Sequence, residues 1–176
     1  IYRQLSQTLL GPNEERFTFA GTGTEIQPDY IYALSISRGQ LREKMDPGNW
    51  ELRISGSGKT TVKFIDDSGA TTNPTVNAGG RVFNVVSGSI ATGTAVTKTA
   101  AASQPGGGLG LFYPDLGIIV LNADTVSVSA SFTQGSGSGV DGKNAGEMYN
   151  AIKRGEYFVS RREEQLNTTH YFARAT

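Results

Sequence analysis

The residues of this chain that come closest to a known chemical motif are Gly56-Ser57-Gly58-Lys59-Thr60. A Gly-Lys-Thr sequence can place backbone amides and an ammonium group around phosphates. The full motif also needs a glycine five residues before Gly58, where this chain has Arg53. The residues after Thr60 alternate as a strand does, whereas the motif must open a helix. We therefore predict a hairpin loop here rather than a nucleotide site.

Two other features could supply acid–base or metal chemistry. Asp66-Asp67 could begin a calcium loop or form a carboxylate pair, but adjacent strand residues point to opposite faces, and Ser68-Gly69 favours a turn. His170 is the only histidine, so a metal site or a triad around it would need carboxylates and hydroxyls from elsewhere. We predict a partly buried or interface histidine. The sequence thus predicts no catalytic residue, no metal site and no cofactor.

The charge balance excludes strong electrostatic attraction to other molecules. The 176 residues include 16 Lys plus Arg and 16 Asp plus Glu, so nothing draws the whole chain to nucleic acid, anionic membranes or acidic substrates. Apolar runs fall short of the roughly 20 residues that a membrane helix needs. A cysteine count of 0 excludes disulfides and thiolate metal sites. Ile1 in place of Met implies processing, trimming or excision from a longer chain.

The elements that must position these residues are mostly strands. Glycine is unusually frequent, at 23 of 176 residues, and clusters with Ser, Thr and Pro in the middle of the chain, which indicates long loops. Apolar and polar residues alternate most clearly over residues 125–132, which we predict to be a strand with a hydroxyl face. Further strands are predicted at residues 30–36, 50–54, 62–65, 82–86, 109–113, 157–159 and 168–175.

Helices are expected to be few. Residues 141–154 place Met148 and Ile152 on one face and are followed by Gly155, which predicts one true helix. A shorter helix is expected at about 38–45. The predicted fold class is mainly β: a β-sandwich or barrel-like antiparallel domain with long Gly/Ser/Thr loops and one or two short helices. We expect a single domain over residues 1–176, with an extended N-terminal arm over residues 1–25.

Three parts of the chain point to one family. They are residues 32–38 with 46–52 (YALSISR and DPGNWEL), residues 113–121 (YPDLGIIVL) and residues 160–172 (SRREEQLNTTHYF). These segments resemble the virion structural proteins of contractile-tailed bacteriophages of the cyanophage type. The third is the most specific, because Glu-Glu-x-x-x-Thr-x-His-Tyr-Phe is not a generic strand pattern. Members of that family continue past the His-Tyr-Phe strand, so a fragment of a longer chain or a short relative is expected.

The resemblance implies a building block of the virion, in the tail, baseplate or neck, with no catalytic residue. Its expected partners are copies of itself and other virion proteins, and neither nucleic acid nor a membrane. We expect the loops around 66–80 and 99–110 to make contacts between subunits. The residues expected to act as interface or core anchors are Trp50, Phe112, Tyr113, His170, Tyr171 and Phe172.

Two other classes of protein remain open at this stage. A β-sandwich module that binds carbohydrate or a cell surface could stack exposed aromatic residues, such as Trp50 or Tyr113, on sugar rings. A glycoside hydrolase would need two carboxylates in one cleft, and no spacing in the sequence indicates such a pair. Saturable binding of a glycan by the isolated chain would favour the binding module.

Overall fold

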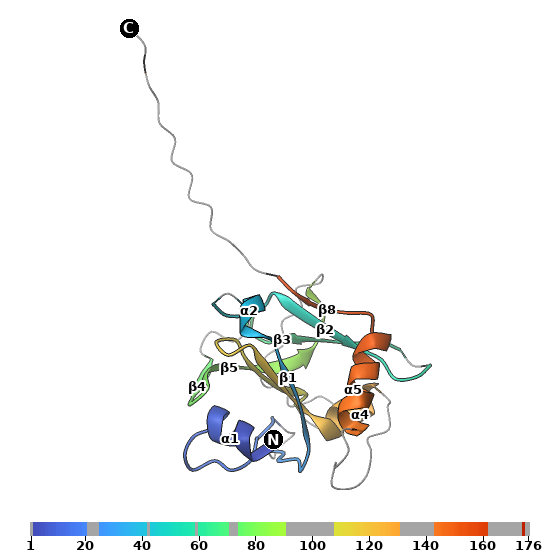
Figure 1. Ribbon diagram of the computed structural model, residues 1–176, viewed down its shortest axis with the longest axis horizontal. Coiled ribbons are helices and arrows are strands. Elements are labelled where there is room, and N and C mark those ends of the chain that lie inside the picture. Colours follow the sequence, from blue (N-terminus) through green and yellow to red (C-terminus); the bar gives the residue numbers. More distant parts are fainter. Residues whose placement is uncertain are drawn as a thin grey trace.

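The computed structural model describes residues 2–20, 25–41, 43–58, 60–70, 74–90, 108–130 and 143–161, together with Arg174. Its strands are β1 (Ile31–Ser35), β2 (Trp50–Ile54), β3 (Val62–Asp66), β4 (Thr75–Asn77), β5 (Gly80–Ser87), β6 (Gly110–Tyr113), β7 (Ile118–Asn122) and β8 (Phe158–Ser160). They form one antiparallel sheet that curls into a half-barrel (Figure 1). The strand order is β1-β7-β6-β5-β3-β2-β8, with β4 paired to β5 beside this path.

The predicted fold class, mainly β and antiparallel with few short helices, is confirmed. The sheet is a single curled one, so it follows the barrel-like form of that prediction and not the two-sheet sandwich. Several of the predicted strands are present. β1, β2, β3, β5 and β6 correspond to the strands predicted at 30–36, 50–54, 62–65, 82–86 and 109–113, in that order.

The described part of the glycine-rich stretch, residues 56–58 and Thr60, lies in the hairpin that joins β2 to β3, as predicted. Gly58 has a φ of 67° in the turn of this hairpin. Residues with a side chain rarely adopt that conformation, so the glycine is explained by backbone geometry. No phosphate-binding helix follows, because the chain continues directly into β3.

The described helices are α1 (Tyr2–Leu9), α2 (Arg38–Leu41), α4 (Ala123–Ala130) and α5 (Lys143–Arg154). α5 confirms the helix predicted over 141–154. α2 is shorter than the predicted 38–45, because the Met45 amide donates instead to the Pro114 carbonyl at 3.0 Å. None of the helices in the described ranges is long and apolar enough to cross a membrane.

The strand predicted over residues 125–132 is wrong, because α4 occupies most of that segment. The Asn122 side chain caps this helix: its Oδ1 accepts from the Asp124 amide at 3.2 Å and from the Thr125 amide at 3.4 Å. Val126 is fully buried in the core below. A cap at the end of β7 and burial of one helical face outweigh a β-like pattern of Ser and Val, whose intrinsic preferences are weak.

The N-terminal region also differs from the expected extended arm. Its first described element is α1, in which Tyr2, Leu5 and Leu9 recur at helical spacing, and Leu9 is fully buried. Together with the following segment, α1 packs on one face of the sheet in a cluster of Leu9, Leu10, Phe17, Phe19, Val82, Tyr113 and Val120. Burial of this apolar stripe explains why the segment is helical and docked.

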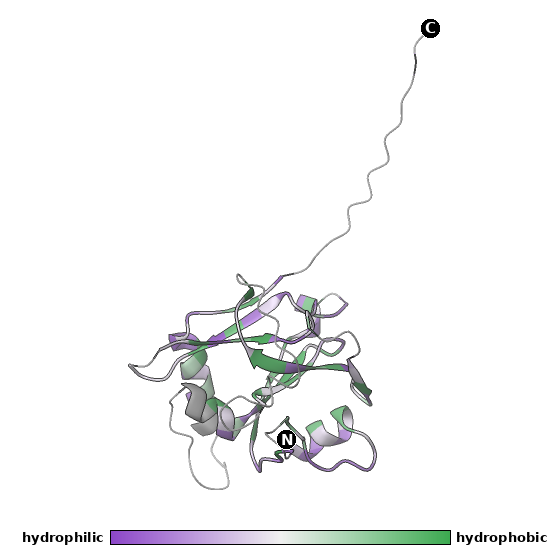
Figure 2. Cartoon of the chain, turned by 180° about the vertical axis from the view of Figure 1, so that it is seen from behind, coloured by the Kyte–Doolittle hydropathy of each residue, from purple (hydrophilic) through white to green (hydrophobic). Residues whose placement is uncertain are grey.

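The sheet is covered on both faces, and alternation along the strands divides its side chains between two cores. In β7, Ile119 and Leu121 face the larger core, while Val120 faces the cluster under α1. α4 and α5 cover the larger core with Val126, Met148 and Ala151. Figure 1 shows α4 and α5 together on one side of the body and α1 on the other, and in Figure 2 the middle of the sheet is its most hydrophobic part.

The cap on α4 can be tested by substitution. Asn122 has no exposed surface, and its Nδ2 also donates to the Gly108 carbonyl at 3.3 Å. We expect Asn122→Ala to lower the free energy of unfolding by about 2 kcal/mol, since it removes a helix cap and leaves a buried carbonyl with less hydrogen bonding. Urea denaturation followed by circular dichroism measures this loss. Asn150→Ala, at an exposed position of α5, is the matched control and should change stability little.

Candidate functional site

The aromatic anchors chosen from the sequence lie in the interior of the protein wherever the structure describes them. Trp50 and Phe112 belong to the larger core and Tyr113 to the cluster under α1, and none of the three has exposed surface. The Trp50 ring lies 5.1 Å from that of Phe112. Neither Trp50 nor Tyr113 can stack on a sugar ring from these positions. Burial raises the pKa of Tyr113 to about 12. The other predicted anchors, His170, Tyr171 and Phe172, lie outside the described residues.

A buried carboxylate, Glu51 on β2, accepts four hydrogen bonds from the protein itself. Its Oε1 accepts from Arg53 Nε at 2.7 Å and from the Tyr157 hydroxyl at 3.3 Å. Its Oε2 accepts from the Ser89 hydroxyl at 2.8 Å and from the Ile90 amide at 2.9 Å. We call these five residues the Glu51 clamp, because they connect β2 to the segment after β5 and to the residue before β8.

The electrostatics of the Glu51 clamp favour a permanently ionised carboxylate. Burial alone would raise the pKa of Glu51, but hydrogen bonds from Arg53, Ser89 and Ile90 outweigh it and lower this pKa to about 2. The Arg53 guanidinium lies 3.9 Å from the centre of the Tyr157 ring, a cation–π contact. A carboxylate held charged by four donors is a structural acceptor and not a general acid or base.

The neighbouring acids Asp66 and Asp67 are also used to hold the backbone. Asp66 accepts from the Gly48 amide at 2.8 Å and from the Ser68 amide at 2.9 Å. Asp67 accepts from the amide and from the side-chain nitrogen of Asn84, at 2.9 and 2.8 Å. The two carboxylates have separate partners, so they do not form an acid–base pair, and the predicted turn follows them at residues 68–70. Among the residues that the structure describes, no cluster of three or more acidic or histidine side chains could hold a metal ion.

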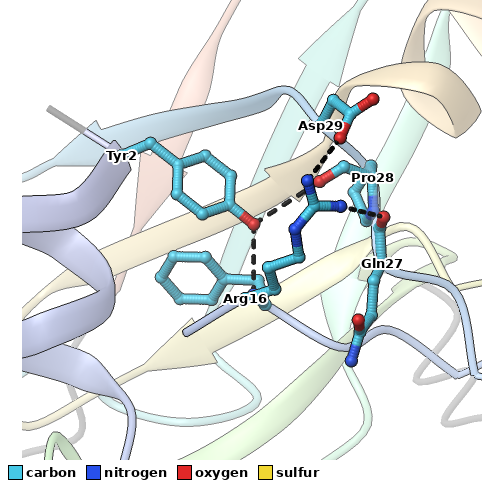
Figure 3. Close-up of polar contacts among 6 residues, drawn as sticks. Tyr2, Arg16, Gln27, Pro28 and Asp29 are labelled. Carbon is cyan, nitrogen blue, oxygen red and sulfur yellow. Dashed lines mark hydrogen bonds and ion pairs between the residues drawn. The ribbon is translucent and has the colours of Figure 1, made fainter. Parts of the chain in front are cut away.

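The surface has a polar groove of about 800 Å³ between α1 and the segments around residues 11–16 and 29. Tyr2 stands in its wall: the hydroxyl accepts from the Phe17 amide at 3.1 Å and donates to the Pro28 carbonyl at 3.4 Å (Figure 3). Arg16 Nη2 forms an ion pair with Asp29 Oδ1 at 2.7 Å. We call this feature the α1 groove. Its side chains include positive and negative charges, and hydrogen-bond donors as well as acceptors. Such a lining suits a ligand with many hydroxyl groups.

A second surface feature is the outer edge of β1, which we call the β1 edge. Among the described strands, β1 pairs with β7 alone. The Ile36 amide donates to the Gly117 carbonyl at 2.9 Å, which identifies this register position as a hydrogen-bonded pair. Because such pairs alternate along an antiparallel ladder, the amide and carbonyl groups of Ile31, Ala33 and Ser35 point away from β7.

The β1 edge lacks the devices that normally protect an open strand. No charged residue and no proline occurs from residue 30 to residue 37, between Asp29 and Arg38. Tyr30 is 42% exposed at its beginning, and Ala33 and Ser35 are exposed along it. Natural proteins usually block such edges with lysine, proline or a bulge, so an apolar, uncharged edge is a site for pairing with another chain.

A smaller open edge occurs on β4, within the loop region 66–80. β4 pairs only with β5 among the described strands, and the Val76 side chain is 70% exposed on it. The second loop expected to contact other subunits spans residues 99–110, and its part at 99–107 lies outside the described residues.

Sequence reasoning missed the α1 groove, the β1 edge and the Glu51 clamp. The uncharged run at 30–37 was a signal for the edge, but a strand becomes an edge only through strand order. Comparison with known proteins adds nothing to these observations, since no family model, no curated protein and no solved structure matches the chain.

Proposed function

We propose that this protein is a structural subunit of a bacteriophage virion, which acts by binding copies of itself and other virion proteins. The positions we propose are the tail, the baseplate and the neck, in accordance with the family that residues 32–38, 46–52, 113–121 and 160–172 resemble. The observation that carries the proposal is the β1 edge. An uncharged edge that no other described strand pairs with is a liability for a free monomer and an asset for a subunit that is always assembled.

The use of the buried acids supports the same function. Glu51 and Asp66 are each 2% exposed and Asp67 is fully buried, and all three are engaged by donors of the protein itself. These groups rigidify the sheet and its turns. A rigid body with an open edge suits a building block, whose task is to present the same contact surface in every copy.

Association of the purified chain tests the proposal. We expect concentration-dependent assembly in sedimentation velocity, and loss of that assembly in Ala33→Lys, which places a charge on the β1 edge. Asn150→Lys adds the same charge at an exposed position on α5 and should assemble normally. A chain that stays monomeric at every concentration, and that mass spectrometry does not find in virions, would overturn the proposal.

Carbohydrate binding is the second candidate function, and the α1 groove is the observation that favours it. Arg16 and Asp29 place a paired cation and anion on the groove wall, and their side chains are 50% and 70% exposed. If the groove binds a glycan, Arg16→Ala should abolish saturable binding on a glycan array. Arg38→Ala, an exposed arginine on α2 outside the groove, should leave it unchanged. No binding by the unaltered chain would exclude this function.

A further inference from the structure

The proposed function leaves open what covers the β1 edge. We infer, resting on that function, that the β1 edge of one copy is completed by the C-terminal segment, residues 162–176, of a second copy, added as an extra strand. The acceptor is the β1 edge. The donor is identified by its sequence and by its start, directly after β8.

The acceptor can hold a strand of about five residues. Ile31, Ala33 and Ser35 each direct one amide and one carbonyl outward, so an added strand can form a regular ladder. On the two faces, Tyr32 and Leu34 belong to the larger core or pack against it, whereas Ala33 and Ser35 are exposed. A partner strand would therefore extend both the core face and the solvent face of the sheet.

The donor begins at the opposite end of the strand order. β8 ends at Ser160, Arg161 is exposed, and the chain then continues with residues 162–176. Residues 165–173 carry no Asp, Glu, Lys or Arg, and residues 168–172 are rich in threonine and aromatic types that favour strands. Arg174 is exposed in the structure. An uncharged strand-like segment thus matches an uncharged edge in length and in chemistry.

The end of β8, after which this segment follows in the sequence, lies at the opposite end of the strand order from the β1 edge of the same copy. Along the sheet, β8 lies six strand positions from β1, or about 29 Å at a spacing of about 4.8 Å. The seven Cα-to-Cα steps from Arg161 to Thr168 span at most about 25 Å.

The direct path across the opening of the half-barrel is occupied by α5. Its Met148 and Ala151 pack in one core with Tyr32 of β1 and Trp50 of β2. Burial raises the pKa of Tyr32, and the charges of Glu147 on α5 and Asp124 on α4 add to that rise. A second copy, approaching from outside, meets neither obstacle.

Such an exchange has a consequence for symmetry. Donor and acceptor are different surfaces, so the contact is head-to-tail, and an open chain of copies keeps one free donor at one end and one free acceptor at the other until a ring closes. A ring of three or more copies around one axis needs this kind of contact.

Cysteine cross-linking tests the inference, because the chain has no cysteine of its own. One preparation carries Ala33→Cys, and four others carry Cys in place of Thr169, His170, Tyr171 or Phe172. The Ala33→Cys preparation is mixed with each of the four others in turn, with oxidised glutathione as the oxidant. The products are separated on a non-reducing gel. We expect the mass to shift from one chain to two in at least one mixture. Val76→Cys, on the open edge of β4, is the matched control and should not give this shift.

Every other outcome has a defined meaning. A covalent dimer of Ala33→Cys with itself would show pairing of two β1 strands and overturn the inference. A chain with both cysteines that closes only within one copy would also overturn it. Assembly of the unaltered chain without any cross-link, or equal assembly of a chain ending at Arg161, would overturn the inference and leave the proposed function intact. No assembly of the unaltered chain would overturn the inference, and together with absence of the chain from virions it would overturn the proposed function as well.

Discussion

Gly155→Ala is expected to lower the free energy of unfolding by about 3 kcal/mol. Gly155 ends α5 and lies against β2, where an added methyl carbon would stand 2.7 Å from the Ile54 Cα and closer still to the Arg53 carbonyl oxygen. Both atoms belong to the backbone of a strand that is paired on both sides, so neither can turn aside as a side chain would. The strain must move α5 away from β2 or distort the sheet.

Gly146→Ala, inside α5, provides the matched control. A methyl group at Gly146 would meet nothing within 4 Å. Alanine is the better helix former, so this change should raise the free energy of unfolding by about 0.5–1 kcal/mol. Urea denaturation of the two variants measures the contrast. Equal stabilities would mean that α5 does not pack on β2 as closely as the structure shows.

Glu51→Gln is expected to cost about 3 kcal/mol near neutral pH, since the native pKa of about 2 lies well below the ordinary value of 4.5. Glutamine keeps the shape of the side chain but removes the charge and turns one acceptor into a donor. That donor would face the Ser89 hydroxyl and the Ile90 amide, or Arg53 and Tyr157. Within the Glu51 clamp, the NH2 group of glutamine would then point at another hydrogen-bond donor, and at least one hydrogen bond would be lost.

The sign of the pH dependence follows from the direction of the shift. The unfolded chain takes up a proton on Glu51 at a higher pH than the native protein does. The stabilisation is therefore complete above about pH 5 and is lost as the pH falls from about 4.5 towards 2.

The difference in unfolding free energy between the unaltered chain and Glu51→Gln, measured by urea denaturation across this range, should shrink accordingly. Glu25→Gln, at an exposed position, should show no such difference. A constant difference from neutral to acid pH would contradict the assignment of Glu51 as an ionised acceptor.

The Glu51 clamp also bears on the proposed assembly. Tyr157 comes directly before β8, and both its hydroxyl and its ring are held by the clamp. The Arg53 amide donates to the Tyr157 carbonyl at 3.1 Å, which adds a backbone connection at the same place. The clamp thus fixes the point from which the C-terminal segment leaves the sheet. As the pH is lowered, we expect assembly of the Glu51→Gln variant to weaken less than assembly of the unaltered chain. The variant has no ionised carboxylate in the clamp to lose.

Local chemistry determined much of this fold. The missing glycine at Arg53 and the alternation after Thr60 were enough to distinguish a hairpin from a phosphate loop. The apolar face of residues 141–154, followed by Gly155, was enough to predict α5. These features depend on neighbours in sequence, so periodicity and turn residues report them directly.

The segment after β7 shows where local patterns fail. Residues 125–132 alternate as a strand does, yet most of them form α4. The deciding contacts are the Asn122 cap and the burial of Val126 among residues from several strands. The cap is local in sequence, but the burial of Val126 requires the assembled sheet, so no window of the sequence contains that second contact.

Tertiary structure alone decided which surfaces are open. The uncharged run at 30–37 identifies a strand, but its place at the end of the strand order makes it an edge. Glu51 has the sequence position of an outward polar residue, and its charge is held by Arg53 on the same strand together with Ser89 and Ile90 from a distant segment. Amino-acid types determine which helix, strand or turn each segment can form. Which backbone groups remain unpaired, and which charges leave water, depends on contacts between distant segments.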